Sequence, residues 1–559
     1  MAPKSKIIFY LLLLFILSSC ANQLPPGGGE LDKVPPRIIE SIPANGTTNY
    51  TDDYFEITFS EYVDRRSVQD AIFISPPIAK GLDYDWGGKT LSVYFKDTLR
   101  SNTTYTIVIG TDVIDLNNRN KMAEPFSFAF STGNQIDIGK ISGKIFDKDP
   151  SGTSVFAYRQ NENEPDPALT KPEYVSQVGK NGKFTLLGLG NGDYKLFAIR
   201  DNFRDLKYQK NDDQFGVQFK DVIISDDKKE FTDVDFFLSI EDTIPPTLSN
   251  VLMKDRNHLQ IEFNEPIDSS KLSADNFYIF DSTANARKEI KYFFKGSVNA
   301  KQFLLSISDS LVEDNNNYLV CKNFIDMNGV VKEYDASQFS VKTQPDTLIP
   351  KVLKVEGTLP EGKVDYDNPL INVEFDDGFD VTKIDTAISI TDAKGFNYGC
   401  SINLIDDASF NIIVNSKLKQ KTEYQLKINL GAVQDAAGNF ADSVYQTEFA
   451  TASELDFSGV TGTVLAETDS VGTMIVLSSA SRDEREYKVK PAPNSKFNFS
   501  KIVPGKYLLW GFIDQNRDSE YDVGKIAPYK KSEKFIFHPD TLNLRARWPV
   551  GDLILDFTK

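Results

Sequence analysis

Short stretches of alternating apolar and polar residues run through most of the chain, and Gly, Pro, Asn and Asp residues separate them. This alternation predicts strands with one buried face, because successive side chains of a strand point to opposite faces of a sheet. The 40 Phe and 23 Tyr residues also favour strands. With 559 residues, the length alone suggests about four domains. The pattern therefore predicts an all-β chain of several domains.

A first repeat occurs three times. Each copy opens with an acidic residue followed by prolines, continues with a strand ending in Phe-x-acid, and then has a Tyr-led strand, an Asp/Asn turn and a closing strand. The openings are residues 32–36, 242–246 and 346–350, and the strand ends are Phe59-Ser60-Glu61, Phe263-Asn264-Glu265 and Phe375-Asp376-Asp377. The later elements start at Tyr105, Tyr318 and Tyr424, turn at 115–117, 326–329 and 435–439, and close at 128–132, 339–343 and 449–451.

Repeats of roughly 100 residues built from short strands and turns predict Greek-key β-sandwiches. The order of motifs resembles the bacterial Ig-like domains of surface-layer proteins and of many Bacteroidota envelope lipoproteins. We expect such domains at 35–133, 242–345 and 346–452. The resemblance implies spacer or adhesive modules and says little about activity.

A second repeat occurs twice without gaps. Its first copy has Lys183-Phe184, Gly192, Tyr194, Leu196, Asp201, Arg204-Asp205 and Tyr208, and its second has Lys496-Phe497, Gly505, Tyr507, Leu509, Asp514, Arg517-Asp518 and Tyr521. Both resemble the small transthyretin-like or carboxypeptidase-regulatory-like β-sandwich, with the Pro-Gly-x-Tyr hairpin visible at residues 503–507. We expect these domains at 134–241 and 453–559, so that the five modules form a tandem array of two types.

The N-terminus has the anatomy of a signal peptide. Lys4 and Lys6 precede an apolar run, 7–17, which is shorter than the roughly 20 residues of a membrane span, and small residues then lead to Cys20. Leu17-Ser18-Ser19-Cys20 resembles the box at which bacterial lipoproteins are acylated and cleaved. We expect a signal peptide at 1–19, acylation of Cys20 with chains such as palmitate, and a flexible Pro/Gly-rich stalk at 20–34. The alternative is an ordinary secretory peptide that ends in a chance Cys.

The lipoprotein resemblance implies the outer membrane. Acidic residues directly after the acylated Cys accompany surface export in Bacteroidota lipoproteins, and residues 21–25 contain none. The periplasmic face is therefore favoured, although Glu30 and Asp32 follow closely and leave the cell surface open.

Composition excludes several functions. The formal charge of −18 disfavours nucleic acid and direct binding to an anionic membrane surface. His258 and His538 are the two histidines of the sequence, which undercuts Ser-His-Asp, Cys-His and His-ligated zinc chemistry. No HExxH, GxSxG or phosphate-binding motif occurs. We expect no enzyme activity and no cofactor other than Ca²⁺ in the C-terminal domain. Cys321 and Cys400 are expected to be buried free thiols, with a disulfide as the alternative.

One acidic loop has the spacing of a calcium loop. Its oxygen-bearing residues alternate as Asp514, Asn516, Asp518, Glu520 and Asp522. Hard cations take six to eight oxygens from such loops. Ser519 and Lys525 depart from the EF-hand pattern, and the first copy of the repeat has Phe203 and Gln209 where Asn516 and Asp522 stand. Ca²⁺ is therefore expected in the C-terminal copy alone, and a solvated loop with Asx turns is the alternative.

A dispersed triplet, Asp followed by Ser or Thr and then a small apolar residue, resembles the O-glycosylation sequon of the Bacteroidota. The candidate acceptors are Thr98, Thr243, Ser310, Thr347, Thr386, Ser443, Ser470 and Thr541. Favourable linker chemistry for Asp-Thr is the alternative.

Two other residue sets suggest carbohydrate chemistry. Trp86, Trp510 and Trp548 are candidates for sugar stacking, but core packing is favoured for Trp510 and the exposure of Trp86 stays open. The acids Glu61, Glu265 and Asp377 stand at one position of three repeats. Because they belong to different domains, no two can flank one glycosidic bond, and a structural role at a strand end is favoured.

These observations predict a non-catalytic outer-membrane lipoprotein that acts as a binding or scaffolding arm. Its partners would be the membrane, through the acyl chains, and envelope proteins of a larger complex for outer-membrane assembly, secretion or nutrient uptake. The first alternative is a glycan-binding or adhesive cell-surface protein. The second is an enzyme of unfamiliar type, which would need a pocket with perturbed carboxylates.

Overall fold

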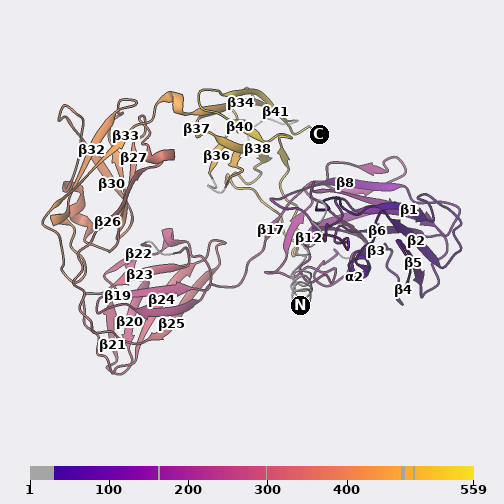
Figure 1. Ribbon diagram of the computed structural model, residues 1–559, viewed down its shortest axis with the longest axis horizontal. Coiled ribbons are helices and arrows are strands. Elements are labelled where there is room, and N and C mark those ends of the chain that lie inside the picture. Colours follow the sequence, from indigo (N-terminus) through magenta and orange to yellow (C-terminus); the bar gives the residue numbers. More distant parts are fainter. Residues whose placement is uncertain (1–30, 161–163, 297–298, 467–471, 482–484, 559) are drawn as a thin grey trace, which may run out of the picture. The chain divides into compact units, whose positions relative to one another are not determined.

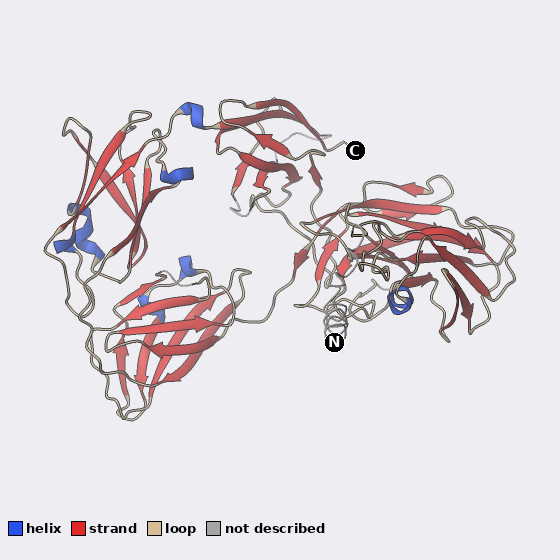
Figure 2. Cartoon of the chain, viewed as in Figure 1, coloured by secondary structure: helices blue, strands red, loops and turns tan. Residues whose placement is uncertain are grey.

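The computed structural model describes residues 31–160, 164–296, 299–466, 472–481 and 485–558 (Figure 1). Strands make up nearly all of its regular structure, and the helices are short (Figure 2). The predicted all-β fold class is confirmed. The helices of the described part of the chain are all too short or too polar to span a lipid bilayer.

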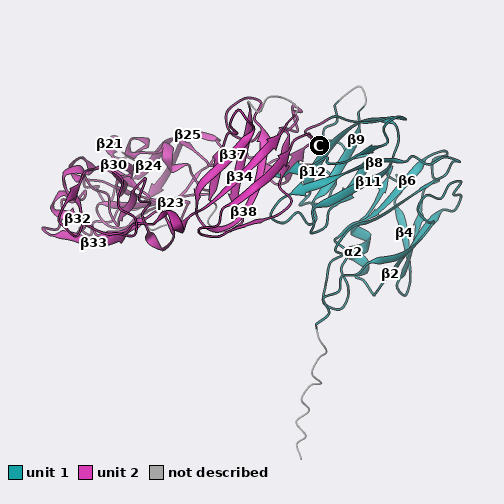
Figure 3. Ribbon diagram, turned by 90° about the horizontal axis from the view of Figure 1, so that it is seen from above, with its two compact units in different colours: residues 1–207, 221–238 teal, residues 208–220, 239–559 magenta. Residues whose placement is uncertain are grey.

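The chain forms two compact units (Figure 3). The first comprises the described residues within 1–207 and 221–238, and the second comprises those within 208–220 and 239–559. The boundary between the units falls inside the expected domain 134–241, because β13 (Gln214–Val217) and β17 (Ser239–Ile240), which pair with each other, group with the second unit. The expected domain bounds stay a prediction.

Sandwich 1, in the first unit, has the strand order of a constant-type Ig domain. One sheet has the order β1-β2-β5-β4 and the other β3-β6-β7. The strands are β1 (Ile38–Ile42), β2 (Tyr54–Phe59), β3 (Ile72–Ser75), β4 (Leu82–Gly87), β5 (Thr90–Phe95), β6 (Thr104–Ile109) and β7 (Phe126–Ser131), and helix α2 is Arg65–Asp70.

Sandwiches 3 and 4, in the second unit, repeat this order with one added strand each. Sandwich 3 consists of β18 (Leu248–Met253), β19 (His258–Phe263), β20 (Phe277–Asp281), β21 (Ala286–Glu289), β22 (Tyr292–Phe294), β23 (Gln302–Ser306), β24 (Asn317–Ile325) and β25 (Val331–Phe339), with η1 (Ser269–Lys271) and η2 (Ala274–Asn276). Sandwich 4 consists of β26 (Val352–Gly357), β27 (Leu370–Phe375), β28 (Ile388–Thr391), β29 (Asn397–Tyr398), β30 (Cys400–Asp406), β31 (Ser409–Val414), β32 (Glu423–Asn429) and β33 (Val444–Ala450), with η3 (Pro360–Gly362), η4 (Val381–Thr386) and η5 (Leu430–Ala432).

Sandwiches 2 and 5 share a second topology, in which the first strand pairs in parallel with the last. Sandwich 2, in the first unit, consists of β8 (Gly139–Phe146), β9 (Ser154–Arg159), β10 (Tyr174–Gln177), β11 (Lys183–Leu189), β12 (Gly192–Arg200), β14 (Val222–Ile224), β15 (Glu230–Phe231) and β16 (Phe236–Phe237). Sandwich 5, in the second unit, follows η6 (Glu454–Asp456) with β34 (Ser458–Leu465), β35 (Thr473–Ser479), β36 (Glu486–Val489), β37 (Lys496–Ile502), β38 (Gly505–Ile513), β39 (Phe535–Phe537), β40 (Leu542–Leu544) and β41 (Val550–Asp556).

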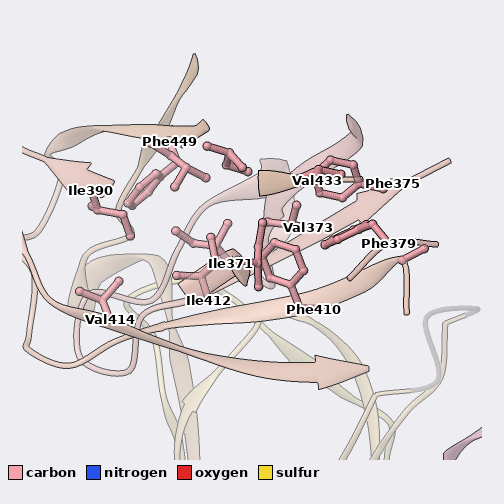
Figure 4. Packing of buried hydrophobic residues seen from close by; sticks show 14 of the residues in the cluster. Ile371, Val373, Phe375, Phe379, Ile390, Phe410, Ile412, Val414, Val433 and Phe449 are labelled. Carbon is pink, nitrogen blue, oxygen red and sulfur yellow. The ribbon is translucent and has the colours of Figure 1, made fainter. Parts of the chain in front are cut away.

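Alternation along the strands builds the cores. On β27, Ile371, Val373 and Phe375 are fully or almost fully buried, and the residues between them are not (Figure 4). They pack in one cluster with Ile390 and Phe449 of the other sheet. Complete burial of each such side chain stabilises the fold by about 1.5–3 kcal/mol. Packing between the buried faces therefore keeps the two sheets together.

A tyrosine fixes the start of the sixth Ig strand in two of the three repeats. Tyr105 and Tyr424 are buried, and each hydroxyl accepts a hydrogen bond of 2.9 Å from a backbone N–H five residues earlier. In sandwich 3 the expected residue, Tyr318, is half-exposed. Asn317 pairs with Phe339 as Tyr105 pairs with Phe130, so the asparagine takes the buried position one residue earlier than predicted.

We expect Tyr105→Phe and Tyr424→Phe each to lower the free energy of unfolding of their sandwich by about 1 kcal/mol, because a buried backbone donor loses its acceptor. Tyr318→Phe is the matched control and should change stability little. Thermal unfolding of the three variants, followed by calorimetry, tests this. Equal losses in all three would contradict the assignment of the corner to Tyr105 and Tyr424.

The two thiols are free, but they differ from the prediction in burial. Cys321 on β24 is fully buried, whereas Cys400 at the start of β30 is half-buried. Burial raises the pKa of both thiols, so neither is an activated nucleophile.

Candidate metal centre

Three carboxylates converge at the entrance of each Ig-type sandwich. One belongs to the linker that enters the domain, one follows the second strand, and one opens the Asp/Asn turn after the sixth strand or its equivalent. The triads are Asp32, Glu61 and Asp115 in sandwich 1, Asp242, Glu265 and Asp326 in sandwich 3, and Asp346, Asp377 and Asp435 in sandwich 4. In each triad, one oxygen from every carboxylate lies within 4.8 Å of the others.

The sequence positions these acids through its neighbours. The strand acid stands two residues after a buried phenylalanine, which is Phe59, Phe263 or Phe375. The turn aspartate is buried, and its Oδ1 accepts backbone N–H groups of its own turn. The linker aspartate accepts the N–H two residues later, at 2.9–3.0 Å. The local turns and the buried phenylalanines therefore direct all three carboxylates toward one point.

The electrostatic effect of this crowding is visible at the glutamates. Burial, together with the nearby charges of the linker and turn aspartates, raises the pKa of Glu61 and of Glu265. Like charges therefore face one another at the domain entrances.

In sandwich 4 a histidine compensates the triad. His258 of sandwich 3, in the same unit, places Nε2 3.0 Å from Asp377 and Nδ1 3.0 Å from Asp255. Burial alone would lower the pKa of His258, but the hydrogen bonds to the two carboxylates outweigh it and raise the pKa to about 10. The imidazole is therefore protonated at neutral pH and supplies a positive charge to the triad.

Side-chain amides provide a second form of compensation. Asn120 Nδ2 donates to Asp115 Oδ2 at 2.8 Å, and Asn439 Nδ2 donates to Asp435 Oδ2 at 2.9 Å. In sandwich 3 the residue equivalent to Asn439 is Val330, which has no donor on its side chain. Asp326 Oδ2 is consequently buried without a hydrogen-bond partner.

Each residue of these triads lies in a motif that the sequence analysis identified, but the convergence was missed. The linker acids marked repeat boundaries, the turn acids were interpreted as turn formers, and the strand acids were treated singly. Their recurrence at three fixed places in three repeats was the available signal.

The predicted calcium loop is differently arranged. Asp514 is buried, with Oδ2 accepting the N–H of Ser519 and Oδ1 lacking a partner. Glu520 pairs with Lys488 at 2.8 Å and Asp522 with Lys530 at 2.7 Å, while Asn516 donates to Asp518 at 2.9 Å. Among the described residues, this loop forms no triad of converging carboxylates like those above. Calcium binding there stays a prediction.

The remaining predicted positions lie as follows. The described candidate glycosylation residues are all exposed: Thr98, Thr243, Ser310, Thr347, Thr386, Ser443 and Thr541. Cys20 and Ser470 lie outside the described residues.

Trp510 is buried, as predicted, and donates to Ser478 Oγ at 3.0 Å. Trp86 is half-buried and stacks on Phe59, and Trp548 is 73% exposed.

Sandwiches 3 and 4 are packed together within the second unit. Tyr292 and Phe294 of β22 belong to the core cluster of sandwich 4. Asp407 accepts the backbone N–H of Phe293 at 2.8 Å, and Asp406 accepts that of Lys295 at 3.0 Å. An edge strand of one sandwich is thus covered by the other. The sequence carried a signal for this contact, because Tyr292-Phe293-Phe294 is an apolar run without alternation. The structure buries all three residues.

Other neighbouring modules are also joined inside each unit. In the first unit, Gln177 of sandwich 2 accepts the N–H of Thr111 of sandwich 1 at 2.7 Å. A Cβ at Gly179 would lie 2.1 Å from the carbonyl oxygen of Ala123, so this approach requires glycine. In the second unit, Lys501 of sandwich 5 pairs with Asp365 and Asp367 of sandwich 4 at 3.1 and 2.9 Å.

Comparison with known families agrees with the Ig topology. A family model described as "Bacterial Ig-like domain" matches residues 32–132 and 349–451. The chain contains bacterial Ig-like domains. The first match begins at Asp32, which also accepts hydrogen bonds from Asn118 and Asn120 through its carbonyl oxygen. The match thus begins three residues before the expected domain start at 35. Residues 20–30 of the predicted stalk, 20–34, lie outside the described residues.

Solved structures that match the chain include two of the bacterial S-layer protein SbsC and one of a pilin. The N-terminal part of SbsC is 14% identical, with 38% of this chain and 45% of that chain covered and a TM-score of 0.17. SbsC domains 1–6 are 10% identical, with 91% and 67% covered and a TM-score of 0.16. The major pilin subunit BcpA of Bacillus cereus is 10% identical, with 75% and 98% covered and a TM-score of 0.15. No curated protein gives a match.

The His258 contacts predict a pH dependence. Because the folded pKa lies above the ordinary value of 6.5, protonation of His258 stabilises the folded state. This contribution is complete below pH 6.5 and is lost as the pH rises through about 10. We expect His258→Gln to destabilise sandwiches 3 and 4 by about 2–3 kcal/mol at pH 6, the scale of hydrogen bonds to charged groups, and by less at pH 10.5.

Calorimetric unfolding at the two pH values measures this difference, and His538→Gln is the matched control. Because the sequence has two histidines, an NMR titration of the imidazole C–H signals follows each separately. Titration of His258 below pH 6.5 would contradict the stabilisation of its protonated form by Asp255 and Asp377.

Proposed function

We propose that this chain is a lipid-anchored, non-catalytic protein of the bacterial outer membrane that acts as a scaffolding arm for other envelope proteins. The observation that carries the proposal is the packing of successive modules inside each unit. Freely jointed spacers do not need a partner's aromatic residues in their core, as sandwich 4 has with Tyr292 and Phe294. Modules that pack against each other within a unit can hold their binding surfaces in a defined arrangement.

The chemistry of the described residues supports a non-catalytic role. His258 is bound between two carboxylates, and the pKa values of Cys321 and Cys400 are raised by burial. The carboxylates that do converge lie at domain entrances in three copies, which favours a structural task over one reaction centre.

The membrane attachment rests on Leu17-Ser18-Ser19-Cys20 and on the linker that follows. The periplasmic face is favoured by the lack of acidic residues at 21–25. Partner proteins would then be components of outer-membrane assembly, secretion or nutrient-uptake complexes.

Cys20→Ala should abolish acylation and release the chain into the soluble fraction, because the attached chains supply the hydrophobic membrane contact. Metabolic labelling with an alkyne fatty acid, followed by membrane fractionation, tests this. Cys321→Ala is the control and should keep both the label and the membrane association. Labelled Cys20→Ala protein would exclude Cys20 as the acylation site.

The scaffold role is tested by purification of the wild-type chain from detergent-solubilised membranes. A stoichiometric membrane protein partner supports it, and recovery of the chain alone with bound glycan would exclude it. The glycan-binding alternative is favoured by the exposure of Trp548, 73%, because exposed aromatic rings stack on sugars. Protease shaving of intact cells decides which face the protein occupies.

A further inference from the structure

The carboxylate triad of sandwich 3, Asp242, Glu265 and Asp326, has neither the histidine that contacts the triad of sandwich 4 nor the side-chain amide that donates to the turn aspartate in sandwiches 1 and 4. In the described part of the chain, no Lys, Arg or His side chain forms an ion pair with these three residues. Lys301 is near but donates to the carbonyl oxygen of Asn264 at 2.7 Å. Asn328 donates to Asp242 Oδ2 at 3.0 Å, and Asn264 to Glu265 Oε1 at 3.2 Å. The side-chain donors that contact this triad are therefore neutral amides.

The unpaired oxygen of Asp326 distinguishes this triad from the other two. Asp326 is 2% exposed, and its Oδ1 is held by the N–H groups of Asn328 and Val330, both at 2.8 Å. Oδ2 is the carboxylate oxygen left for the triad, and it is buried with no hydrogen-bond partner. Burying a charged oxygen without a partner costs free energy. A cation bound beside this oxygen would therefore stabilise the fold.

We propose that Asp242, Glu265 and Asp326 bind one Ca²⁺ ion. Carboxylate oxygens are the ligands that this hard cation prefers, and it binds them at about 2.3–2.6 Å. Two ligands of one calcium ion can therefore lie up to about 5 Å apart, which accommodates oxygens within 4.8 Å of one another. Asp242 and Glu265 are partly exposed, so water completes the coordination and the ion enters from that side.

The ion would bind the entering linker to the body of the domain. Asp242 belongs to the linker, Glu265 follows β19, and Asp326 opens the turn between β24 and β25. Calcium thus does at sandwich 3 what the protonated His258 does at sandwich 4. This inference is independent of the lipid anchor and of any partner protein.

Calorimetric titration of CaCl₂ into the chelator-treated protein tests the proposal. We expect saturable binding with a Kd on the order of 0.1–1 mM, the range of extracellular calcium modules, and weaker binding of MgCl₂, which requires a tighter octahedral shell. Glu265→Gln and Asp326→Asn should each weaken one site by at least about tenfold. Asp435→Asn, in the triad that His258 already compensates, is the matched control and should keep that site.

A variant that retains all three carboxylates distinguishes a loss of calcium binding from a loss of folding. Val330→Asn copies Asn439 and provides an amide for Asp326 Oδ2, so it should fold and bind calcium more weakly. In chelator, Asp326→Asn should unfold at a temperature no lower than that of the wild type, because a repulsion is removed. The calcium-induced rise in Tm should be absent from this variant.

Three results would overturn the proposal. The first is a wild-type chain with no saturable calcium binding. The second is full binding in Asp326→Asn, and if Asp518→Asn then lost it, the ion would belong to the loop 514–522. The third is unchanged binding in Val330→Asn, which would remove Asp326 Oδ2 from the ligand set.

Discussion

The repulsion between three carboxylates at a domain entrance is the constraint around which each Ig-type sandwich is arranged. Their oxygens lie within 4.8 Å of one another because a buried phenylalanine, an Asx turn and the entering linker all deliver an acid to the same place. Such a cluster is stable only with donors or positive charge beside it. The three repeats share the acids and differ in how they meet this requirement.

The repeats differ in whether the groups that compensate the triad come from the same sandwich or from a neighbouring one. In sandwich 4 the positive charge that compensates the triad comes from His258, a residue of the preceding sandwich. The contact that compensates these carboxylates therefore also joins the two modules. Sandwich 1 uses the amide of Asn120 and is satisfied within its own domain. At sandwich 3, Val330 stands where an amide would be, and Asp326 Oδ2 has no partner. One fold therefore supports three kinds of domain entrance.

Module packing adds a second level of organisation. The β22 edge of sandwich 3 is covered by sandwich 4, whose Asp406 and Asp407 accept the backbone N–H groups that an exposed edge would leave open. Glycine at 179 permits a similarly close approach between sandwiches 1 and 2. Neighbours within a unit are thus selected by shape and by hydrogen bonds, which a simple spacer would not require.

The sequence by itself determined the strands, the two repeat types and the Ig-type order, because alternation and turn chemistry are local and recur several times. It also located every acid of the triads. Tertiary structure decided that Asp242, Glu265 and Asp326 meet, since they are far apart in sequence and only the strand order brings them together. It also decided that Asn317, not Tyr318, faces the core, because a strand shifted by one residue reverses its faces. The physical reason is the same in both cases: local patterns specify elements, whereas charge compensation and register depend on partners distant along the chain.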